Sequence, residues 1–138
     1  MTRPIPPPIV ISELDAERIE TLLETPLAGS LDTRALEAEL DRAERVAPTA
    51  MPPDVVSMNS VARVRDETSG AVREIALVYP RDADGDPGRV SILAPIGTAL
   101  LGLRVGSTIR WPLPGGRSTR LTVEAISYQP EAAGDLHR

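Results

Sequence analysis

The 138-residue sequence contains no cysteine and only one histidine, His137, next to its last residue. Without cysteine there is no disulfide, no thiolate metal ligand and no cysteine nucleophile. A histidine in that position is poorly suited to a preorganised site, so the base-activated dyads and triads of nucleophilic enzymes lack a part. We therefore expect a protein without catalytic residues, metal site or cofactor.

Aromatic residues and long apolar runs are also scarce. There is no phenylalanine, and the sequence has one tryptophan and two tyrosines. No apolar run approaches the roughly 20 residues that cross a bilayer. The first residues, M-T-R-P-I-P-P-P-I-V-I, lack the apolar core and cleavage site of a secretion signal. We expect a cytoplasmic protein that makes no membrane contact.

Lysine is absent, and all fifteen basic residues are arginine. The net charge of -5 is uneven, because residues 1–45 hold ten acids against five arginines whereas residues 46–138 hold ten of each. The arginines are scattered along the sequence and form no stripe that would neutralise a phosphate backbone. This pattern predicts no strong autonomous nucleic-acid binding. The acidic first third is better suited to a basic protein surface.

The first third of the sequence reads as two short helices. Residues 1–11 are proline-rich and predicted to be extended. Ser12 followed by Asp15 is typical of a helix N-cap, and this helix is expected to run to about Glu24. Thr25–Leu31, T-P-L-A-G-S-L, is predicted to be a turn. A second helix, starting at Asp32 or Thr33, has apolar residues at the spacing of a coiled-coil seam: Leu36, Leu40, Ala43 and Ala47. The pattern predicts an antiparallel coiled-coil hairpin over residues 12–47, about 20 Å long.

The rest of the sequence reads as a small sheet domain. Pro48, Pro52 and Pro53 predict a hinge over residues 48–56, and residues 57–138 then alternate between short extended runs and turns. A helix over Pro95–Leu101 is expected to cross the sheet, because a proline suits a first helical turn. Together these elements predict an α+β fold. The expected strands are 61–65, 72–79, 90–93, 107–113 and 120–128.

Three motifs that suggest a binding or packing site are better explained as turns. Counting from Asp82, D-A-D-G-D would need glycine at its sixth position and glutamate at its twelfth to bind calcium, but Pro87 and Leu93 stand there. The glycines of two further motifs lie outside any strand-glycine-helix unit. We interpret them as turn residues: Gly102, Gly106, Gly115 and Gly116.

Several separated motifs carry a family resemblance. The run A-P-I-G-T-A-L-L-G-L-R-V-G-S (94–107), followed by an alternating strand, the turn Pro114-Gly115-Gly116 and a last strand, resembles the C-terminal FKBP-like domain of the bacterial Gre transcript-cleavage factors. Within that superfamily the sequence resembles the Rnk regulators of nucleoside diphosphate kinase. The motifs for this closer resemblance are L-D-A-E-R-I (14–19), A-E-L-D-R-A (38–43), P-P-D-V-V-S-M-N-S (52–60) and Y-Q-P-E-A-A-G-D (128–135).

The resemblance implies binding to RNA polymerase at the rim of its secondary channel. The sheet domain is expected to make this contact through residues at and after the strand-to-helix loop: Ala94, Pro95, Ile96 and Leu101. An acidic face on the hairpin would point toward the channel, and its members are Glu17, Glu20, Glu24, Asp32, Glu37 and Glu44. DNA and RNA would then be reached only through the polymerase.

Transcript cleavage is not expected, although Gre factors present two carboxylates at the tip of a long coiled coil to help hold a magnesium ion. Here the turn over residues 25–31 contains no acid, and Glu24 and Asp32 only flank it. The resemblance therefore implies a monomeric, non-enzymatic regulator of transcription elongation. It would compete with Gre-type factors without stimulating cleavage, and altered nucleoside diphosphate kinase levels would be its regulatory outcome.

Two alternatives stay open at this point. An FKBP-like domain could be a peptidyl-prolyl isomerase, but that pocket is lined with aromatics and the sequence offers only Trp111, Tyr79 and Tyr128. A homo-oligomeric adaptor could instead use the apolar seam between residues 36 and 47 to join chains.

Overall fold

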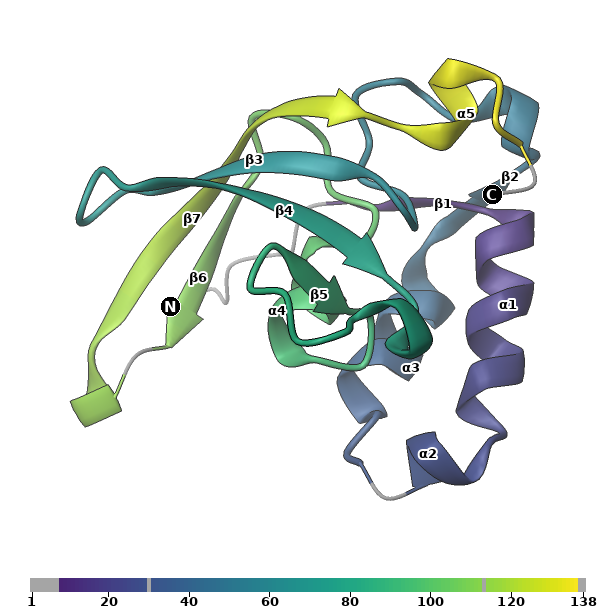
Figure 1. Cartoon of the computed structure of the whole chain (residues 1–138), viewed down its shortest axis with the longest axis horizontal. Coiled ribbons are helices and arrows are strands. Elements are labelled where there is room, and N and C mark those ends of the chain that lie inside the picture. The colour runs from purple at the N-terminus through teal and green to yellow at the C-terminus, as the bar shows by residue number, and fades with distance from the viewer. Residues whose placement is uncertain (1–7, 30, 113, 137–138) are drawn as a thin grey trace.

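The computed structural model describes residues 8–29, 31–112 and 114–136. It is a mixed α+β fold in which N-terminal helices pack beside a curled sheet (Figure 1). The first third of the chain holds β1 (Val10–Ser12), α1 (Glu13–Leu23), α2 (Pro26–Gly29), α3 (Arg34–Arg42) and β2 (Glu44–Val46). The predicted extended segment falls largely on residues 1–7, which lie outside the described part.

Helix α1 begins as the sequence predicts. The Asp15 N–H donates to Oγ of Ser12 at 3.0 Å, which satisfies one of the free donors at the helix start. Ala16 and Ile19, three residues apart, are buried on the side of α1 that faces the core, while Glu17 and Glu20 are exposed.

The sheet has five strands in the order β5-β4-β3-β7-β6. All neighbours are antiparallel except β4 and β5, which are parallel. Helix α4 (Pro95–Leu100) lies under the concave side of the sheet (Figure 1). The strands and the last helix are β3 (Val61–Asp66), β4 (Val72–Val78), β5 (Arg89–Ser91), β6 (Thr108–Pro112), β7 (Ser118–Tyr128) and α5 (Pro130–Ala133).

One core unites the helices with the concave side of the sheet. Leu100 and Leu103 are buried there, and Ile96 packs against the same cluster at its edge, so these three apolar residues face the core. Ile19 of α1 belongs to this core. It also contains buried residues from α3 and the strands: Leu36, Leu40, Ala62, Val64, Ile75, Leu77, Leu121 and Val123.

The prediction that the second helix continues to Ala47 is wrong. Helix α3 ends at Arg42, and Ala43 is already extended. The chain then pairs with β1 in parallel, with Val10 opposite Glu44, and the Glu44 N–H donates to the Ile9 carbonyl at 3.1 Å. Because β1 offers free backbone groups at this point, the segment gains strand hydrogen bonds in place of a last helical turn. Of the predicted seam, only Leu36 and Leu40 lie on the helix.

The segment predicted as a hinge is packed onto the sheet domain. Met51, Val55 and Val56 are buried, and the Val56 N–H donates to the Leu103 carbonyl at 2.9 Å. The side-chain amide of Gln129 donates to the carbonyls of Pro52 and Val55, at 2.7 Å each. These contacts tie the segment to the sheet domain from two sides. The division of the chain into domains at residues 11, 47 and 56 stays a prediction.

Across the described ranges, no helix is both long and apolar enough to cross a membrane.

Candidate functional site

The loop that leads into α4 is a fixed structure. Ala94 is extended and Pro95 occupies the first helical turn. The Thr98 hydroxyl donates to the Ile92 carbonyl at 2.9 Å. A side chain at Gly97 would place its Cβ 2.1 Å from the Ser91 carbonyl oxygen, so only glycine fits there. Since this packing leaves the loop little freedom, Pro95 is held in a defined, exposed position.

Pro95 and Ile96 are adjacent in the chain and each lines a different hollow; together with Ala94 we call them the contact ridge. Pro95 lines a hollow of about 650 Å³ shared with the start of α3. Ile96 lines another of about 320 Å³ under the sheet, together with Trp111 and Leu121. Pro95 is exposed, and Ala94 and Ile96 are half-buried.

The hollow beside Pro95 brings together two groups of residues that the sequence analysis treated separately. Asp32 and Thr33 approach it from the start of α3, whereas Leu93, Pro95 and Thr98 approach it from the α4 loop. The structure therefore places one predicted acidic residue and one predicted contact residue in the same depression. More than sixty positions of sequence separate Asp32 from Pro95.

Asp32 is not a free carboxylate. The Arg34 side chain donates to its two oxygens, at 3.0 Å from Nε and 2.8 Å from Nη2, and the Arg34 backbone N–H donates at 3.2 Å. These hydrogen bonds lower the pKa of Asp32 to about 2. The carboxylate is therefore charged at neutral pH, and its charge is largely matched by the neighbouring guanidinium.

Leu101 was predicted as part of the contact surface, and that assignment is wrong. Its side chain is only 1% exposed and belongs to the common core. It lies at the C-terminal end of α4, where the apolar residues turn toward the sheet. A partner cannot reach Leu101 while the domain is folded.

The remaining predicted acids are exposed and spread over three elements. Glu17, Glu20 and Glu24 follow α1 at helical spacing, Glu37 lies on α3 and Glu44 on β2. Glu20 pairs with Arg45 at 3.0 Å, and Glu37 accepts a hydrogen bond from Thr33 at 3.1 Å. Among the described residues no three acidic or histidine side chains are close enough together to hold a metal ion.

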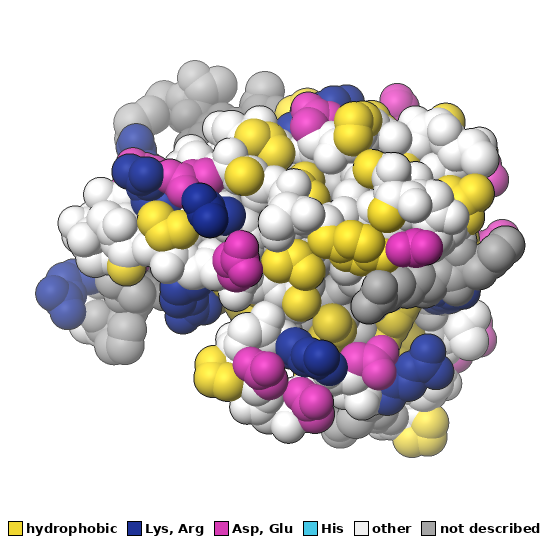
Figure 2. Space-filling model, turned by 45° about the horizontal axis from the view of Figure 1, so that its top comes forward, with side chains coloured by type: hydrophobic (Ala, Val, Ile, Leu, Met, Phe, Trp, Pro, Cys, Tyr) yellow, Lys and Arg dark blue, Asp and Glu magenta, His cyan; other side chains and the backbone are white. Residues whose placement is uncertain are grey.

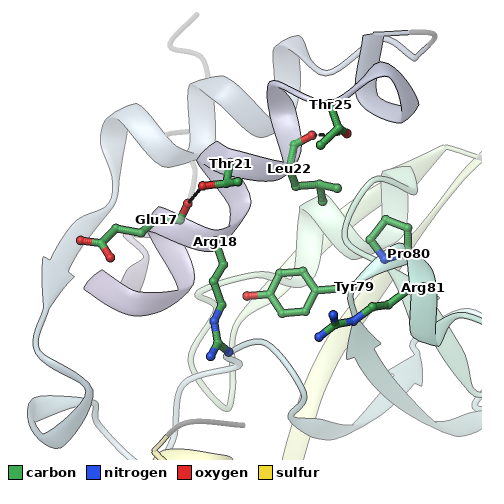
Figure 3. A pocket seen from close by; sticks show the side chains of 8 residues that line it. All are labelled: Glu17, Arg18, Thr21, Leu22, Thr25, Tyr79, Pro80 and Arg81. Atoms are coloured by element: carbon green, nitrogen blue, oxygen red, sulfur yellow. Dashed lines mark hydrogen bonds between the residues drawn. The ribbon is translucent and has the colours of Figure 1, made fainter.

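A further hollow, of about 710 Å³, lies between α1 and the turn after β4 (Figure 3). The Tyr79 ring faces Arg18 and Leu22 across it. Burial raises the pKa of the Tyr79 hydroxyl. The Thr21 and Thr25 hydroxyls donate back to α1 carbonyls, at 3.0 and 2.7 Å, which leaves the walls mainly apolar. Sequence reasoning missed this hollow, because nothing in the sequence indicates that residues 17–25 lie beside residues 79–81.

The three aromatic side chains are distributed over separate places. Trp111 lines the hollow under the sheet, and Tyr79 lies against α1. The Tyr128 hydroxyl donates to Asp135 near the C-terminal helix. An aromatic-lined pocket for a proline ring would need several of them together. Trp111 lines the hollow beside Ile96 of α4, and neither tyrosine lines that hollow.

Comparison with known proteins decides the family. Residues 51–128 match the family model described as "Transcription elongation factor, GreA/GreB, C-term", and residues 7–46 match "Rnk N-terminus". The chain is 53% identical over 130 residues to the "Regulator of nucleoside diphosphate kinase" of Escherichia coli K12, covering 94% of this chain and 96% of that protein. The chain belongs to the Rnk family. The predicted resemblance is thereby confirmed.

The GreA relative described next matches a smaller part of the chain, whereas the solved structure covers most of it. The transcription elongation factor GreA of Rhodospirillum rubrum is 35% identical over 83 residues, which is 60% of this chain and 53% of that protein. A solved structure described as a GreA/GreB transcription elongation factor from Nitrosomonas europaea superposes with a TM-score of 0.75 at 51% identity, covering 88% of this chain and 99% of that chain. The contact ridge lies within the GreA/GreB match, and α1 to β2 lie within the Rnk match.

Proposed function

We propose that this Rnk protein is a non-catalytic transcription regulator that binds RNA polymerase through its contact ridge. It acts at the rim of the secondary channel and competes there with Gre-type factors. The observation that carries the proposal is the fixed, exposed Pro95, which lines one hollow while Ile96 lines another, in a chain of the Rnk and GreA/GreB families. Regulation of nucleoside diphosphate kinase follows as an outcome of altered transcription.

The contact ridge has the physical properties of a protein-docking element. Binding costs less when the docking segment is already held in its bound shape. The Gly97 packing and the Thr98 hydrogen bond supply that order. A partner protein can pack against the apolar contact ridge and the hollows that Pro95 and Ile96 line. Well-packed contacts of this kind contribute most of the binding free energy of an interface. The acidic residues of α1 add charge that speeds encounter with a basic partner.

Binding without transcript cleavage is part of the proposal. A hard divalent cation at a phosphate needs carboxylate oxygens that are free to coordinate it. The turn over residues 25–31 has no acid, and Arg34 already occupies both oxygens of Asp32. We also assign α1 and α3 to a shortened coiled-coil hairpin and the sheet with α4 to an FKBP-like arrangement. We place the protein in the cytoplasm, as a monomer.

The test is a pull-down of core RNA polymerase with the full chain and with Pro95→Asp. The substitution places a charge on the contact ridge at an exposed position, so we expect the chain to fold and the retained polymerase to fall about tenfold or more, as for loss of a hot spot. Pro53→Asp is the matched control, because Pro53 is also exposed and lines neither hollow. An excess of a Gre factor should displace the wild-type chain.

Failure of the wild-type chain to retain polymerase at micromolar concentration would reject the proposal. An equal loss of retained polymerase with Pro95→Asp and Pro53→Asp would indicate that the polymerase contact lies outside the contact ridge. Trp111 in the hollow under the sheet is the one feature that favours isomerase activity. Turnover of a proline peptide that disappears in Trp111→Ala would support that alternative.

A further inference from the structure

Among the described residues, no helix covers the convex side of the sheet (Figure 1). Helix α4 lies under the concave side, and the other helices lie beside the sheet (Figure 1). Side chains alternate between the two sides along each strand. On β3, Ala62 and Val64 are buried toward the core, whereas Arg63 and Arg65 are exposed on the opposite side. The convex surface of these strands is therefore available to a partner.

Exposed arginines from three strands gather on this convex side. Arg110 of β6 lies directly opposite Arg120 of β7 in the strand register. Thr122, two residues after Arg120, pairs with Arg65 of β3. Diagonal neighbours of this kind lie roughly 7 Å apart. We call the set the arginine face, and its members are Arg63, Arg65, Arg110 and Arg120. Figure 2 shows arginine side chains gathered on the side of the molecule where the β6–β7 end lies.

Two of these guanidinium groups lack a matching negative charge. Like charges directly opposite each other on neighbouring strands are destabilising. Within the described residues neither Arg110 nor Arg120 takes part in an ion pair, although Nε of Arg110 donates to Oγ of Ser118 at 3.1 Å. In a chain with a net charge of -5, the fold keeps two positive groups side by side. An anion from outside would relieve that repulsion.

Three carboxylates also lie on the convex side, and they do not cancel the positive charge of the arginine face. Glu124 pairs with Arg65, and Glu74 lies opposite Arg63 in the register. Glu67 lines a hollow of about 460 Å³ together with Arg110 and Arg120. With four guanidinium groups against three carboxylates, the face keeps a positive balance. Arg110 and Arg120, which share their hollow with Glu67, carry that balance at the β6–β7 end.

The hollow at the β6–β7 end still has hydrogen-bond donors to offer. The Thr119 hydroxyl donates to Asp66 at 2.6 Å and lies 2.8 Å from the Thr68 hydroxyl, so both groups are engaged. The Ser118 hydroxyl accepts from Arg110, which leaves its own proton for a ligand oxygen. Two guanidinium groups and one hydroxyl proton are suited to the oxygens of a phosphate group.

We propose that the arginine face binds the phosphate backbone of a single-stranded nucleic acid. The positive groups extend over several positions of the sheet, which suits a polymer with one charge per unit. At the β6–β7 end Trp111 lies on the concave side, opposite Thr119, so the arginines there would contact phosphates without stacking bases and without reading sequence. A flexible strand can follow a curved surface, whereas a duplex is too stiff to do so at this scale.

This inference departs from the sequence-based expectation that nucleic acid is reached only through the polymerase. The arginines are scattered in the sequence and are brought together by the strand register. It is independent of the proposed polymerase contact, because the contact ridge belongs to α4 under the concave side and the arginine face lies on the convex side.

The experiment measures fluorescence anisotropy of a labelled oligouridine of about a dozen nucleotides with the full chain. With about three phosphates neutralised, we expect log K to fall with log salt at a slope of about -2, a loss of roughly 20-fold in affinity between about 50 and 200 mM salt. In Arg110→Ser/Arg120→Ser the slope should shrink to about -0.7 and affinity should fall about tenfold or more. Arg81→Ser/Arg89→Ser, which removes two exposed arginines outside the face, should behave as wild type.

Each alternative outcome of the experiment has a meaning. Absence of binding at low salt, or equal loss in the two double variants, would overturn the proposal. Displacement of the oligonucleotide by polyglutamate at equal charge concentration would also overturn it and would indicate an acidic protein segment as the partner. Arg110→Glu alone, at an exposed strand position, repeats the test should the double variant fail to fold.

Discussion

Asp15 shows how one buried carboxyl group links α1 to the rest of the molecule. Its side chain is only 3% exposed, and the Met58 N–H donates to its Oδ2 at 3.1 Å. The pKa of Asp15 is raised to about 7, mainly by burial; the Met58 hydrogen bond opposes this shift and the charge of Glu131 adds to it. The folded protein therefore holds a proton at Asp15 over a pH range in which the unfolded chain has lost it.

We predict that this proton makes stability fall as pH rises. The pKa of Asp15 in the folded protein lies above the unfolded value of 3.8. Its stabilising contribution is therefore complete below about pH 4 and is lost as pH rises toward 7. Over this range the free energy of unfolding falls by about 1.4 kcal/mol per pH unit because of this residue. Asp15→Asn keeps a carbonyl oxygen for Met58 and has no charge to desolvate. In urea unfolding at several pH values between 5 and 8, the free energy of unfolding of the variant should increase relative to that of wild type as pH rises.

The difference between the two proteins is the informative quantity, since other titrating groups contribute to both. An unchanged difference across the pH series would mean that Asp15 is charged in the folded state.

The sequence identified Asp15 only as an acid near a helix start. That role is real, since its N–H donates to Ser12. Its burial depends on Met58, which is 43 positions away and which no local pattern connects to it. The same limit explains Leu101, whose place in an apolar run did not reveal that it faces the core.

At the scale of elements, Gly102 connects the sheet domain to the first strand. Its φ is +79°, and its N–H donates to the Val56 carbonyl at 2.8 Å. Its carbonyl accepts from Val10 at 3.3 Å, and a Cβ at this position would lie 2.7 Å from Cβ of Ile9. Gly102 therefore lets β1 approach closely behind α4. Gly106 also has a positive φ, +92°, but nothing lies within 4 Å of its would-be Cβ.

We predict that Gly102→Ala costs more stability than Gly106→Ala. Both substitutions place a side chain in the left-handed region, which costs about 1 kcal/mol or more. Only the first also pushes against Ile9 and the Val10 backbone, which should add about 1–3 kcal/mol. Urea unfolding of the two variants measures the difference. Equal losses would show that the contact between β1 and the α4 end does not contribute to stability.

Most elements of the sheet domain were predictable, because alternation and turn residues are local signals. The five expected strands and the helix after Pro95 agree with β3 to β7 and α4 within a few residues. Residues 43–47 were mispredicted for a physical reason. Their apolar spacing continues that of α3, but pairing with β1, which lies more than thirty positions earlier, decides their conformation.

At the scale of the whole molecule, the helices and the sheet share one core. Leu36 and Leu40 are 2% and 3% exposed, so the seam that could join two chains is already covered within one chain. We predict a monomer of 14.8 kDa by sedimentation equilibrium from micromolar to millimolar concentration. A mass that rises toward a dimer would instead support the adaptor alternative.

The candidate site was only partly predictable at this scale. Pro95 and Asp32 were singled out by resemblance, but their common hollow depends on how α3 packs beside α4. The arginine face is invisible in the sequence, since β6 to β7 pairing places Arg110 opposite Arg120 and β3 adds its arginines from fifty positions away.

The parallel pairing of β1 with β2 has a consequence for length. The chain leaves β1 at Ser12 and returns at Glu44, which pairs with Val10 two residues before Ser12, and α1, α2 and α3 are formed in between. Equal insertions into α1 and α3 would lengthen this helical segment while β1 and β2 at its two ends stayed paired. The reach of the N-terminal region could therefore be varied by protein engineering without rebuilding the domain that carries it.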